Sequence, residues 1–435
     1  MSTARRWAGS RDAQIAGAIA AGALVVRVVW VLTLERRGLP ANDTLFYHVV
    51  GSLLSEGQGY ELLDGTATAR WPPAFTALVG GVYAVVGTHQ LAVELLNAVL
   101  GAAAVAALYA LARHAFGRAG AVAASSALAL SPGAVMFTDV LMPETLYTLM
   151  VLGVLGAALA VDPSRRLGAL AIGGLVGLAA LTRGEGFLLA LVPLAAWSTG
   201  RQWRALLAPA ALLVAGVVLV VAPWTVRNAI ALDAFVPVST NGAQTLWSGH
   251  NPTATGGATY PRPELLAPSA GLRGPARELR DAEILRADAL EWMRSHPGRE
   301  LELIPRKLWF LNSGPGPALG IWLDPNGAPL VDGAGTAAVA QDIAYPANWL
   351  LLVAFAASLV VCRRVILGSA AGRGALALLV AAVPLYGFVL YGNFRYRVPL
   401  EPLMILLAAP LAQTAWVRFG TGRRGRTAGA EPGSA

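Results

Sequence analysis

The sequence has little cysteine and little charge. Its single cysteine, Cys362, excludes an internal disulfide and argues against a cysteine-based metal site. Only 13% of the 435 residues are charged, whereas about a quarter are charged in typical soluble domains. Hydrophobic residues make up 56% of the chain, and its mean hydropathy is +0.57. A chain this apolar needs a bilayer around it, so the composition predicts a polytopic α-helical membrane protein.

Several apolar runs have the length that a bilayer requires, since a helix needs about 20 residues to cross a hydrocarbon core of ~30 Å. We expect ten spans with both termini inside, because every inside segment then carries at least two arginines. The first span is expected to be uncleaved, and Arg27 within it to snorkel outward. The ten ranges are 12–34, 91–112, 119–138, 144–161, 167–182, 185–200, 205–223, 345–362, 374–391 and 398–416.

The stretch 71–86 is apolar but short. If it crossed the membrane, the next three basic loops would lie outside, so we interpret it as an interfacial or re-entrant helix. The predicted fold is all-α and polytopic, with about ten transmembrane helices, interfacial helices in the first external loop and one external loop domain. The predicted parts are a membrane module (1–226) with a catalytic first external loop (35–90), an extracytoplasmic loop domain (227–344), C-terminal transmembrane helices (345–419) and a disordered cytoplasmic tail (420–435).

The loop domain is the only part with the composition of a soluble protein. Gly274-Pro275 is typical of a helix start, an apolar stripe follows, and Ser295-His296-Pro297 stops the helix. A second helix is expected over about 299–312, and its residue Lys307 suits a membrane interface.

Several charges lie on the unexpected, external side of the membrane. The arginines are Arg70, Arg183, Arg227, Arg395 and Arg397, and the acids Asp139 and Glu144 join them near one span end. Charged side chains are costly inside a span, so charges from separate segments at one depth indicate a polar pocket. Guanidinium groups bind phosphate oxygens in bidentate fashion, which suits a pyrophosphate or phosphodiester headgroup.

Asp43 follows the first span, in Asn42-Asp43-Thr44-Leu45-Phe46-Tyr47-His48, and Arg70-Trp71-Pro72-Pro73 comes soon after. A carboxylate base, a cation and a rigid turn therefore share one short stretch beside the membrane. This combination favours chemistry on a lipid-borne substrate over passage of a solute.

An ordered set of motifs resembles a known family. After Asp43 and Arg-Trp-Pro-Pro come Met-Pro-Glu-Thr-Leu-Tyr (142–147), Leu-Thr-Arg-Gly-Glu-Gly (181–186), Ser-Thr-Asn-Gly (239–242), Gly-His-Asn-Pro (249–252) and Arg-Tyr-Arg-Val-Pro-Leu-Glu-Pro (395–402). The sequence resembles the GT-C glycosyltransferases, in particular the protein-mannosyltransferase and aminoarabinose-transferase-like group (family 39-like). The resemblance extends over nearly the whole chain and implies transfer of a sugar from a polyprenyl phosphate on the external membrane face.

The resemblance makes Asp43 the general base and Glu144 the second catalytic acid. It places Arg70 near the donor phosphate, and Arg183 and Arg395 at matching basic positions. One departure is Glu94, which stands where relatives often carry an arginine. The candidate substrate-binding residues are Arg70, Arg183, Arg395, Arg397, Asp139, His250, Asn251 and Lys307.

Glycosyl transfer needs a base for the acceptor hydroxyl and cations for the departing phosphate. One base and one displaced phosphate imply inversion at the anomeric carbon. No cofactor is required, although Asp43 and Glu144 have the oxygen ligands for a divalent metal. The expected partners are a polyprenyl-phosphate-sugar, a lipid, glycan or protein acceptor, and membrane lipids, with no nucleic acid, in a multi-pass plasma-membrane protein whose site is extracytoplasmic.

Other interpretations stay open at this point. A lipid or sugar transporter or flippase would carry mid-membrane charges in two related halves, and no internal repeat is visible here. A non-catalytic scaffold, or an enzyme that moves a phosphorus-containing group, is a third class. Among single residues, Arg183 and Glu185 also fit a plain turn with a salt bridge, and His250 fits a hydrogen-bonding role.

Overall fold

The computed structural model describes residues 11–33, 35–36, 43–198, 203–312, 331–332 and 334–427, and the regular secondary structure of this part of the chain is almost entirely helical. The exception among the described residues is a two-stranded antiparallel sheet of β1 (Glu35–Arg36) and β2 (Val331–Asp332), in which Glu35 pairs with Asp332. The prediction of an all-helical polytopic membrane protein is confirmed.

Six helical segments of the described chain are long and apolar enough to cross a membrane, or seven if one bent pair forms a single span. The bent pair turns by 48° at Leu130-Ser131-Pro132, since a proline cannot continue the preceding helix. The six are α2 (Arg11–Thr33), α5 (Gln90–Phe116), α11 (Leu207–Leu232, preceded by η3, Trp203–Leu206), α15 (Ala334–Val361), α17 (Ala370–Pro384) with η6 (Leu385–Val389), and α18 (Phe394–Arg397) with η7 (Val398–Leu400) and α19 (Glu401–Thr427); the bent pair is α6 (Arg118–Ala129) with α7 (Pro132–Met136) and η1 (Phe137–Asp139).

The other three predicted spans fall on shorter apolar helices. These are α8 (Glu144–Ala160), α9 (Arg166–Ala180) and the continuous pair η2 (Gly184–Ala190) and α10 (Leu191–Trp197). A helix of 17 residues, such as α8, is about 25 Å long, just short of a typical hydrocarbon core. The ten-span topology therefore stays a prediction. The predicted tail begins within α19, which extends to Thr427, and residues 428–435 lie outside the described chain.

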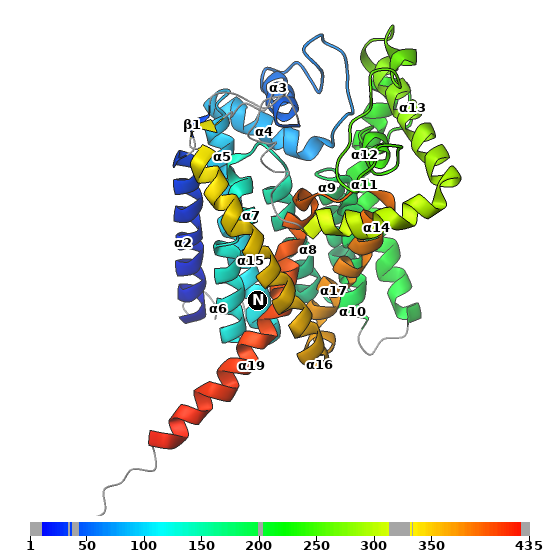
Figure 1. The fold of residues 1–435 in the computed structure, drawn as a ribbon. Coiled ribbons are helices and arrows are strands. Elements are labelled where there is room, and N and C mark those ends of the chain that lie inside the picture. Colours follow the sequence, from blue (N-terminus) through cyan, green and yellow to red (C-terminus); the bar gives the residue numbers. More distant parts are fainter. Residues whose placement is uncertain are drawn as a thin grey trace, which may run out of the picture.

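The first loop forms two helices at one end of the bundle, α3 (Asp43–Ser55) and α4 (Pro73–Val86). Pro73 occupies the first turn of α4, where its missing N–H costs nothing. Figure 1 shows α3 and α4 capping the same end of the bundle as α12 (Gly242–Gly249) and α13 (Gly274–Ser295), away from α16 (Arg363–Gly368) and the end of α19. This position agrees with an interfacial helix over 71–86.

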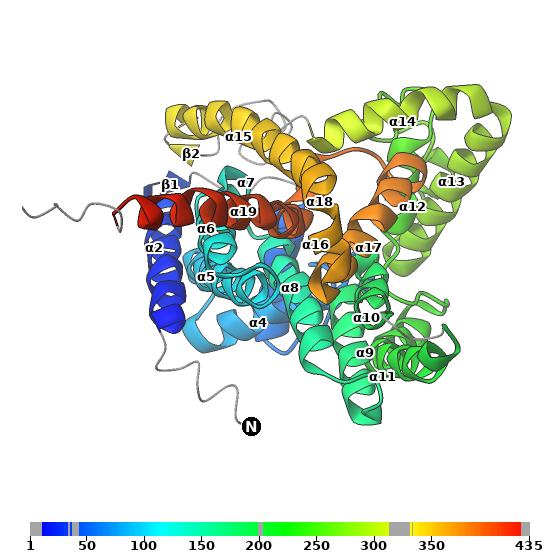
Figure 2. The ribbon, with the colours of Figure 1, turned by 90° about the horizontal axis from the view of Figure 1, so that it is seen from below.

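The second loop folds as the sequence predicts. α13 ends at Ser295, and α14 (Pro297–Asn312) follows it directly. The buried stripe of α13 (Ala282, Leu285, Ala289) packs against α12, and the short helix η4 (Ala267–Ser269) precedes it. Viewed along the bundle in Figure 2, α13 and α14 lie at the corner opposite α2, with α8 near the centre.

Close packing of small residues joins α9 and α11. A Cβ placed on Gly173 would lie 2.1 Å from the Leu213 carbonyl oxygen, so the two backbones are in direct contact. Glycine permits such an approach, and helix packing in membranes depends on it because lipid removes most of the hydrophobic driving force between helices. The main core also draws Leu108, Leu155 and Leu406 from α5, α8 and α19.

Arg27 is a correction to the sequence analysis, because it does not snorkel to the membrane surface. Its side chain is buried at 1% exposure, and its guanidinium donates to the carbonyl oxygens of Ala23 (3.2 Å), Ala129 (3.1 Å) and Leu128 (3.3 Å). Leu128 and Ala129 end α6, where carbonyl groups lack helical partners and favour a cation. Arg27 therefore joins α2 to the break between α6 and α7.

We expect Gly173→Ala to destabilise the protein although alanine favours helices by about 1 kcal/mol over glycine. The added methyl would force α9 away from the Leu213 carbonyl. Gly174→Ala is the matched control, since its Cβ would meet Val220 at an ordinary 3.6 Å. Thermal unfolding in detergent measures both variants. Equal melting temperatures for the two would contradict the packing argument.

Candidate active site

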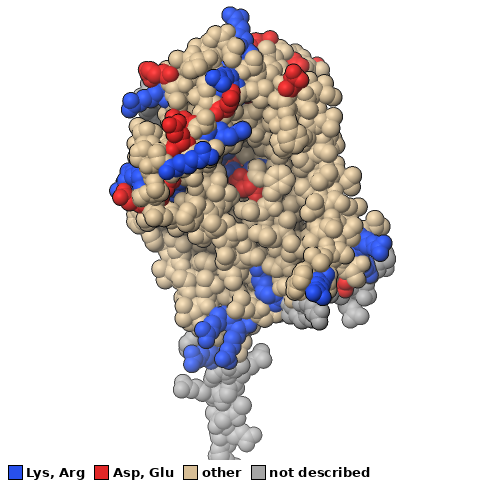
Figure 3. All heavy atoms as spheres, turned by 90° about the vertical axis from the view of Figure 1, so that its right-hand side faces the viewer, with Lys and Arg blue, Asp and Glu red and all other residues tan. Residues whose placement is uncertain are grey.

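A large cavity of about 1390 Å³ opens beneath the capping helices. Segments far apart in the chain form its walls: the start of α3, the turn at 70–72, the link 182–185 between α9 and η2, α12, and the segment 390–396. Figure 3 shows a recess with charged side chains inside it, below the charged surface of the loop domain. Four predicted site residues line this cavity: Asp43, Arg70, Arg183 and Arg395.

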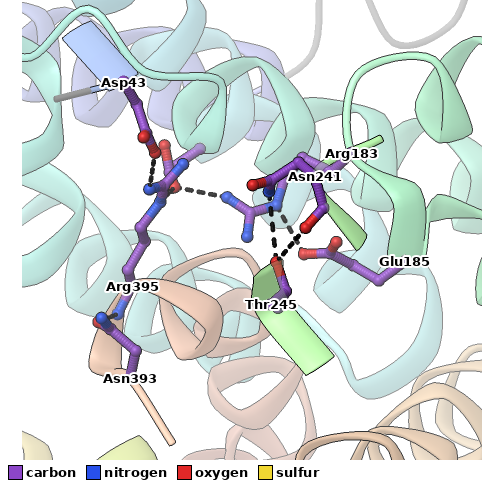
Figure 4. A network of polar contacts seen from close by, with 8 residues as sticks. Asp43, Arg183, Glu185, Asn241, Thr245, Asn393 and Arg395 are labelled. Carbon is purple, nitrogen blue, oxygen red and sulfur yellow. Dashed lines mark hydrogen bonds and ion pairs between the residues drawn. The ribbon is translucent and has the colours of Figure 1, made fainter. Parts of the chain in front are cut away.

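A continuous chain of ion pairs runs along the cavity wall (Figure 4). The Arg395 guanidinium binds both the Asp43 and the Glu144 carboxylates. Glu144, fully buried, also accepts from Arg183 at 2.5 Å, and Arg183 binds Glu185 at 2.6 Å. Two arginines thus connect three carboxylates.

Local structure holds both arginines of this chain in place. The Asn393 side chain caps α18 by accepting from the Arg395 amide (3.0 Å). Arg183 lies over the rings of Tyr147 (5.8 Å) and Tyr396 (5.3 Å). Burial opposes the charge of Arg183, but Glu185 and Glu144 outweigh this effect and raise the pKa of its guanidinium above the ordinary value.

Arg70 differs from the paired arginines. Its side chain is exposed to the cavity, and it has no ion-pair or hydrogen-bond partner among the described residues. Only its backbone is fixed, because its amide donates to Thr68 Oγ1 (3.1 Å) and its carbonyl accepts from Asn241 (3.3 Å). Arg70 therefore presents an available cation to whatever enters the cavity.

Glu278 of α13 holds the segment before Arg70. Its carboxylate accepts from Thr68 Oγ1 (2.6 Å), the Ala69 amide (3.1 Å) and Thr240 Oγ1 (2.8 Å). Arg227 of α11 reaches the same segment and donates to the Thr68 carbonyl at 2.7 Å. The loop domain thereby fixes the position of the cavity turn.

Two predicted site residues lie elsewhere. Arg397 forms an ion pair with Glu401 (2.8 Å) and lines a separate, mostly apolar cavity of about 340 Å³ beside α6, α15 and α19. Asp139 is buried and accepts from the Trp30 indole (3.1 Å), and it does not line the large cavity. Arg397 and Asp139 are close in the sequence to Arg395 and Glu144, which belong to the ion-pair chain. Each side chain nevertheless lies on another face of its segment.

His250, Asn251 and Lys307 lie behind the cavity rather than in its lining. Lys307, the only lysine of the chain, contacts His250 Nε2 (3.1 Å), and Glu300 meets the other ring nitrogen (2.6 Å). Asn251 donates to the Trp247 carbonyl (2.8 Å) at the end of α12. Burial lowers the pKa of Lys307 to about 8, with Glu300 opposing the shift. This cluster supports α12 and the segment 389–392.

Gly392 shows how tightly that support fits. Its amide donates to the Gly256 carbonyl at 2.8 Å, and a Cβ on it would lie 1.9 Å from the Lys307 carbonyl oxygen. Only glycine allows α14 to press against the segment that leads to Arg395.

Several residues at this site have little or no signal in the sequence. Glu185 fits a plain turn salt bridge with Arg183 in the sequence, whereas in the structure this salt bridge ends the ion-pair chain. Glu278 was one of several acids on an amphipathic helix, without a signal of its own. Asn241 and Thr245 carry a detectable signal, since they belong to the Ser-Thr-Asn-Gly motif and the helix that follows it.

A divalent metal between Asp43 and Glu144 does not fit the geometry. The Arg395 guanidinium lies between the two carboxylates and binds both. Within the described part of the chain, no cluster of three or more His, Cys, Asp or Glu side chains has the arrangement of a metal site.

One part of the chain matches a known protein family. Residues 70–226 match the family model of the dolichyl-phosphate-mannose-protein mannosyltransferases. This segment is similar to that family, which is of the GT-C glycosyltransferase type. The resemblance inferred from the motifs is confirmed. The matched segment includes Arg70, Glu144, Arg183 and Glu185. None of the curated proteins matches the chain.

Solved structures of an oligosaccharyltransferase share the fold at low sequence identity. The archaeal oligosaccharyltransferase AglB from Archaeoglobus fulgidus, in complex with an inhibitory peptide and a dolichol-phosphate, has a TM-score of 0.58 at 14% identity, covering 98% of this chain and 52% of that chain. The same enzyme tethered to an acceptor peptide gives 0.54 at 14% identity, with 96% and 51% covered. ArnT from Cupriavidus metallidurans bound to undecaprenyl phosphate gives 0.42 at 18% identity, with 93% and 79% covered. The chain thus spans about half the length of the oligosaccharyltransferases it matches.

The His250 cluster predicts a dependence of stability on pH. Burial, followed by the charge of Lys307, lowers the pKa of His250 below its ordinary 6.5, although Glu300 opposes this shift. The unfolded chain therefore binds the proton first, and stability falls as the pH drops below 6.5 towards the folded-state pKa. Melting temperatures in detergent between pH 7 and pH 5 measure the fall. His250→Gln should flatten the slope, while the exposed His296→Gln should not. Identical slopes in all three proteins would refute it.

Proposed function

We propose that this protein transfers a sugar from a polyprenyl-phosphate donor to a hydroxyl acceptor on the extracytoplasmic membrane face. The acceptor is a glycolipid, a cell-wall glycan or a protein. The match of residues 70–226 to the mannosyltransferase family model supports a GT-C-type glycosyltransferase. AglB binds dolichol-phosphate and a peptide, and its shared fold supports a polyprenyl-phosphate ligand here.

One observation carries the proposal: Asp43 and the unpaired Arg70 line one cavity with Arg183 and Arg395. A carboxylate and cations in one cleft are what transfer from a phosphodiester requires. A base removes the proton of the acceptor hydroxyl, and cations stabilise the phosphate that leaves. The cavity lies at the capped end of the helix bundle. This location suits a lipid whose phosphate headgroup enters the cavity while its tail stays in the bilayer.

In the proposed mechanism, Asp43 takes the acceptor proton as the hydroxyl oxygen attacks the anomeric carbon. The bond to the phosphate oxygen breaks at the same time, and the phosphate keeps that electron pair. Arg70 pairs with the phosphate, and Arg395 orients Asp43 through their ion pair. A single displacement inverts the anomeric configuration. Glu144 acts as a positioning residue, since its buried carboxylate holds Arg183 and Arg395 together.

We expect Asp43→Asn to lower the rate of glycosyl transfer by about 10²–10⁴, the usual contribution of a general base. Transfer from undecaprenyl-phosphate sugars to envelope extract measures the loss, and an unchanged melting temperature shows that the variant folds. Asp64→Asn is the matched control, because Asp64 lines the same cavity but accepts only from Thr66. Unchanged transfer by Asp43→Asn would remove this residue from the mechanism.

Arg70→Ala should weaken binding of undecaprenyl phosphate by about 10- to 100-fold, because a hydrogen bond to a charged group contributes about 1.5–3 kcal/mol. Titration calorimetry in detergent measures the affinity directly. Arg262→Ala is the control, since this arginine is exposed in the loop domain and lies outside the cavity lining. If Arg70→Ala binds as tightly as the wild type, the phosphate lies elsewhere in the cavity.

A further inference from the structure

A second part of the cavity wall is uncharged, in contrast to the part formed by the ion-pair chain. Its lining residues between 239 and 248 are Ser239, Asn241, Gly242, Gln244, Thr245 and Ser248, and none of them is charged. Apart from Gly242, they carry amide or hydroxyl side chains, which both donate and accept hydrogen bonds.

Helical periodicity places four of these residues on one face of α12 and its N-cap. The opposite face, with Ala243 and Trp247, is buried against α13, and the Trp247 indole donates to Asp288 at 2.7 Å. Positions 241, 244, 245 and 248 recur at the three- and four-residue spacing of one helix face, which here turns to the cavity. Figure 4 shows Asn241 and Thr245 beside Arg183 and Glu185.

Some polar groups of this wall are committed and others are available. Thr245 Oγ1 donates to the Asn241 backbone carbonyl (3.1 Å), and Ser248 Oγ donates to the Thr259 carbonyl (2.7 Å). The Asn241 side chain is partly committed, since its Nδ2 donates to Thr245 Oγ1 (3.3 Å). By contrast, the Gln244 amide and the Ser239 hydroxyl have no partner among the described residues. Polar groups on a rigid element without protein partners can serve a ligand.

We propose that this face of α12, with Gln244, Asn241 and Ser239, binds an uncharged sugar ring, the one that the donor carries. Sugar hydroxyls donate and accept at once, as these side chains do. A phosphate would require cations on this wall, and an amino sugar would require carboxylates. This inference rests on the proposed function.

The position of Arg70 favours the donor's sugar over the acceptor's. The backbone N–H of Asn241 donates to the Arg70 carbonyl oxygen at 3.3 Å. A phosphate on Arg70 therefore places the sugar joined to it next to the start of α12. Asp43 stands on the charged wall, so an acceptor hydroxyl approaches from that side.

Calorimetric titration of the full-length protein in detergent tests this site. The probes are undecaprenyl phosphate alone and undecaprenyl phosphate carrying glucose, mannose, arabinose or 4-amino-4-deoxyarabinose. At least one neutral sugar should tighten binding about tenfold over the bare lipid. Gln244→Leu should abolish that gain and leave affinity for the bare lipid unchanged. Ser239→Ala is a second, smaller change. Gln58→Leu is the control, since the exposed Gln58 side chain bonds only to Glu56 within the described chain.

Several results would overturn the inference. These are no gain from any neutral sugar, a larger gain from the amino sugar, or wild-type affinities in both wall variants. Weaker binding of the bare lipid by Gln244→Leu would assign this wall to the phosphate instead. Methyl glycosides of the same sugars test the acceptor, because a Gln244-dependent affinity for them alone would move the sugar to the acceptor side. Binding needs no turnover, so these results are read independently of the Asp43→Asn assay.

Discussion

The site depends on one electrostatic arrangement, the chain of ion pairs from Asp43 through Arg395, Glu144 and Arg183 to Glu185. These residues come from the first loop, the start of α8, the α9–η2 link and α18, so the interaction fixes four segments relative to one another. Glu144 is the centre of it. A carboxylate that is fully buried costs several kcal/mol to desolvate, and here two guanidiniums compensate for that cost. Loss of Arg183 or Arg395 would leave the buried Glu144 carboxylate without full charge compensation inside an apolar helix bundle.

The same arrangement explains why the surrounding packing is so close. An ion pair in a medium of low dielectric constant is strong only if its geometry is held. Asn393 caps the helix of Arg395, Gly392 lets that segment press on α14, and the aromatic rings of Tyr147 and Tyr396 enclose Arg183. On the other side, Glu278 fixes the turn that ends in Arg70. Packed helices therefore hold the ion-pair chain in place, and the loop domain holds the turn that ends in Arg70.

Sequence patterns predicted the membrane class, the two loop-domain helices and four of the five residues of the ion-pair chain, all but Glu185, because each has a signal in the sequence: a long apolar run, a Gly-Pro start, a charged residue at an external span end. They did not predict which side chains face the cavity. Arg395 and Arg397 are two residues apart, yet one binds Asp43 and the other binds Glu401 beside a different cavity. Arg27 has the sequence context of a snorkelling residue, and only the break between α6 and α7 supplies the carbonyl groups that bury it. Such outcomes depend on tertiary contacts that no local pattern contains.

The charges of the cavity separate two roles for its arginines. The ion-pair chain holds three carboxylates and two guanidiniums, so it has no surplus cation to offer a phosphate. Arg183 and Arg395 would have to give up carboxylate partners, one of them fully buried, to bind a ligand directly. Arg70 has no such cost, because its guanidinium has no partner within the described chain. A negatively charged headgroup is therefore drawn to the turn at 70–72, and the paired arginines act by holding Asp43 and the cavity wall in place. This division assigns recognition of the phosphate to the first loop and leaves α12, which is hydrogen-bonded to that loop, next to the sugar.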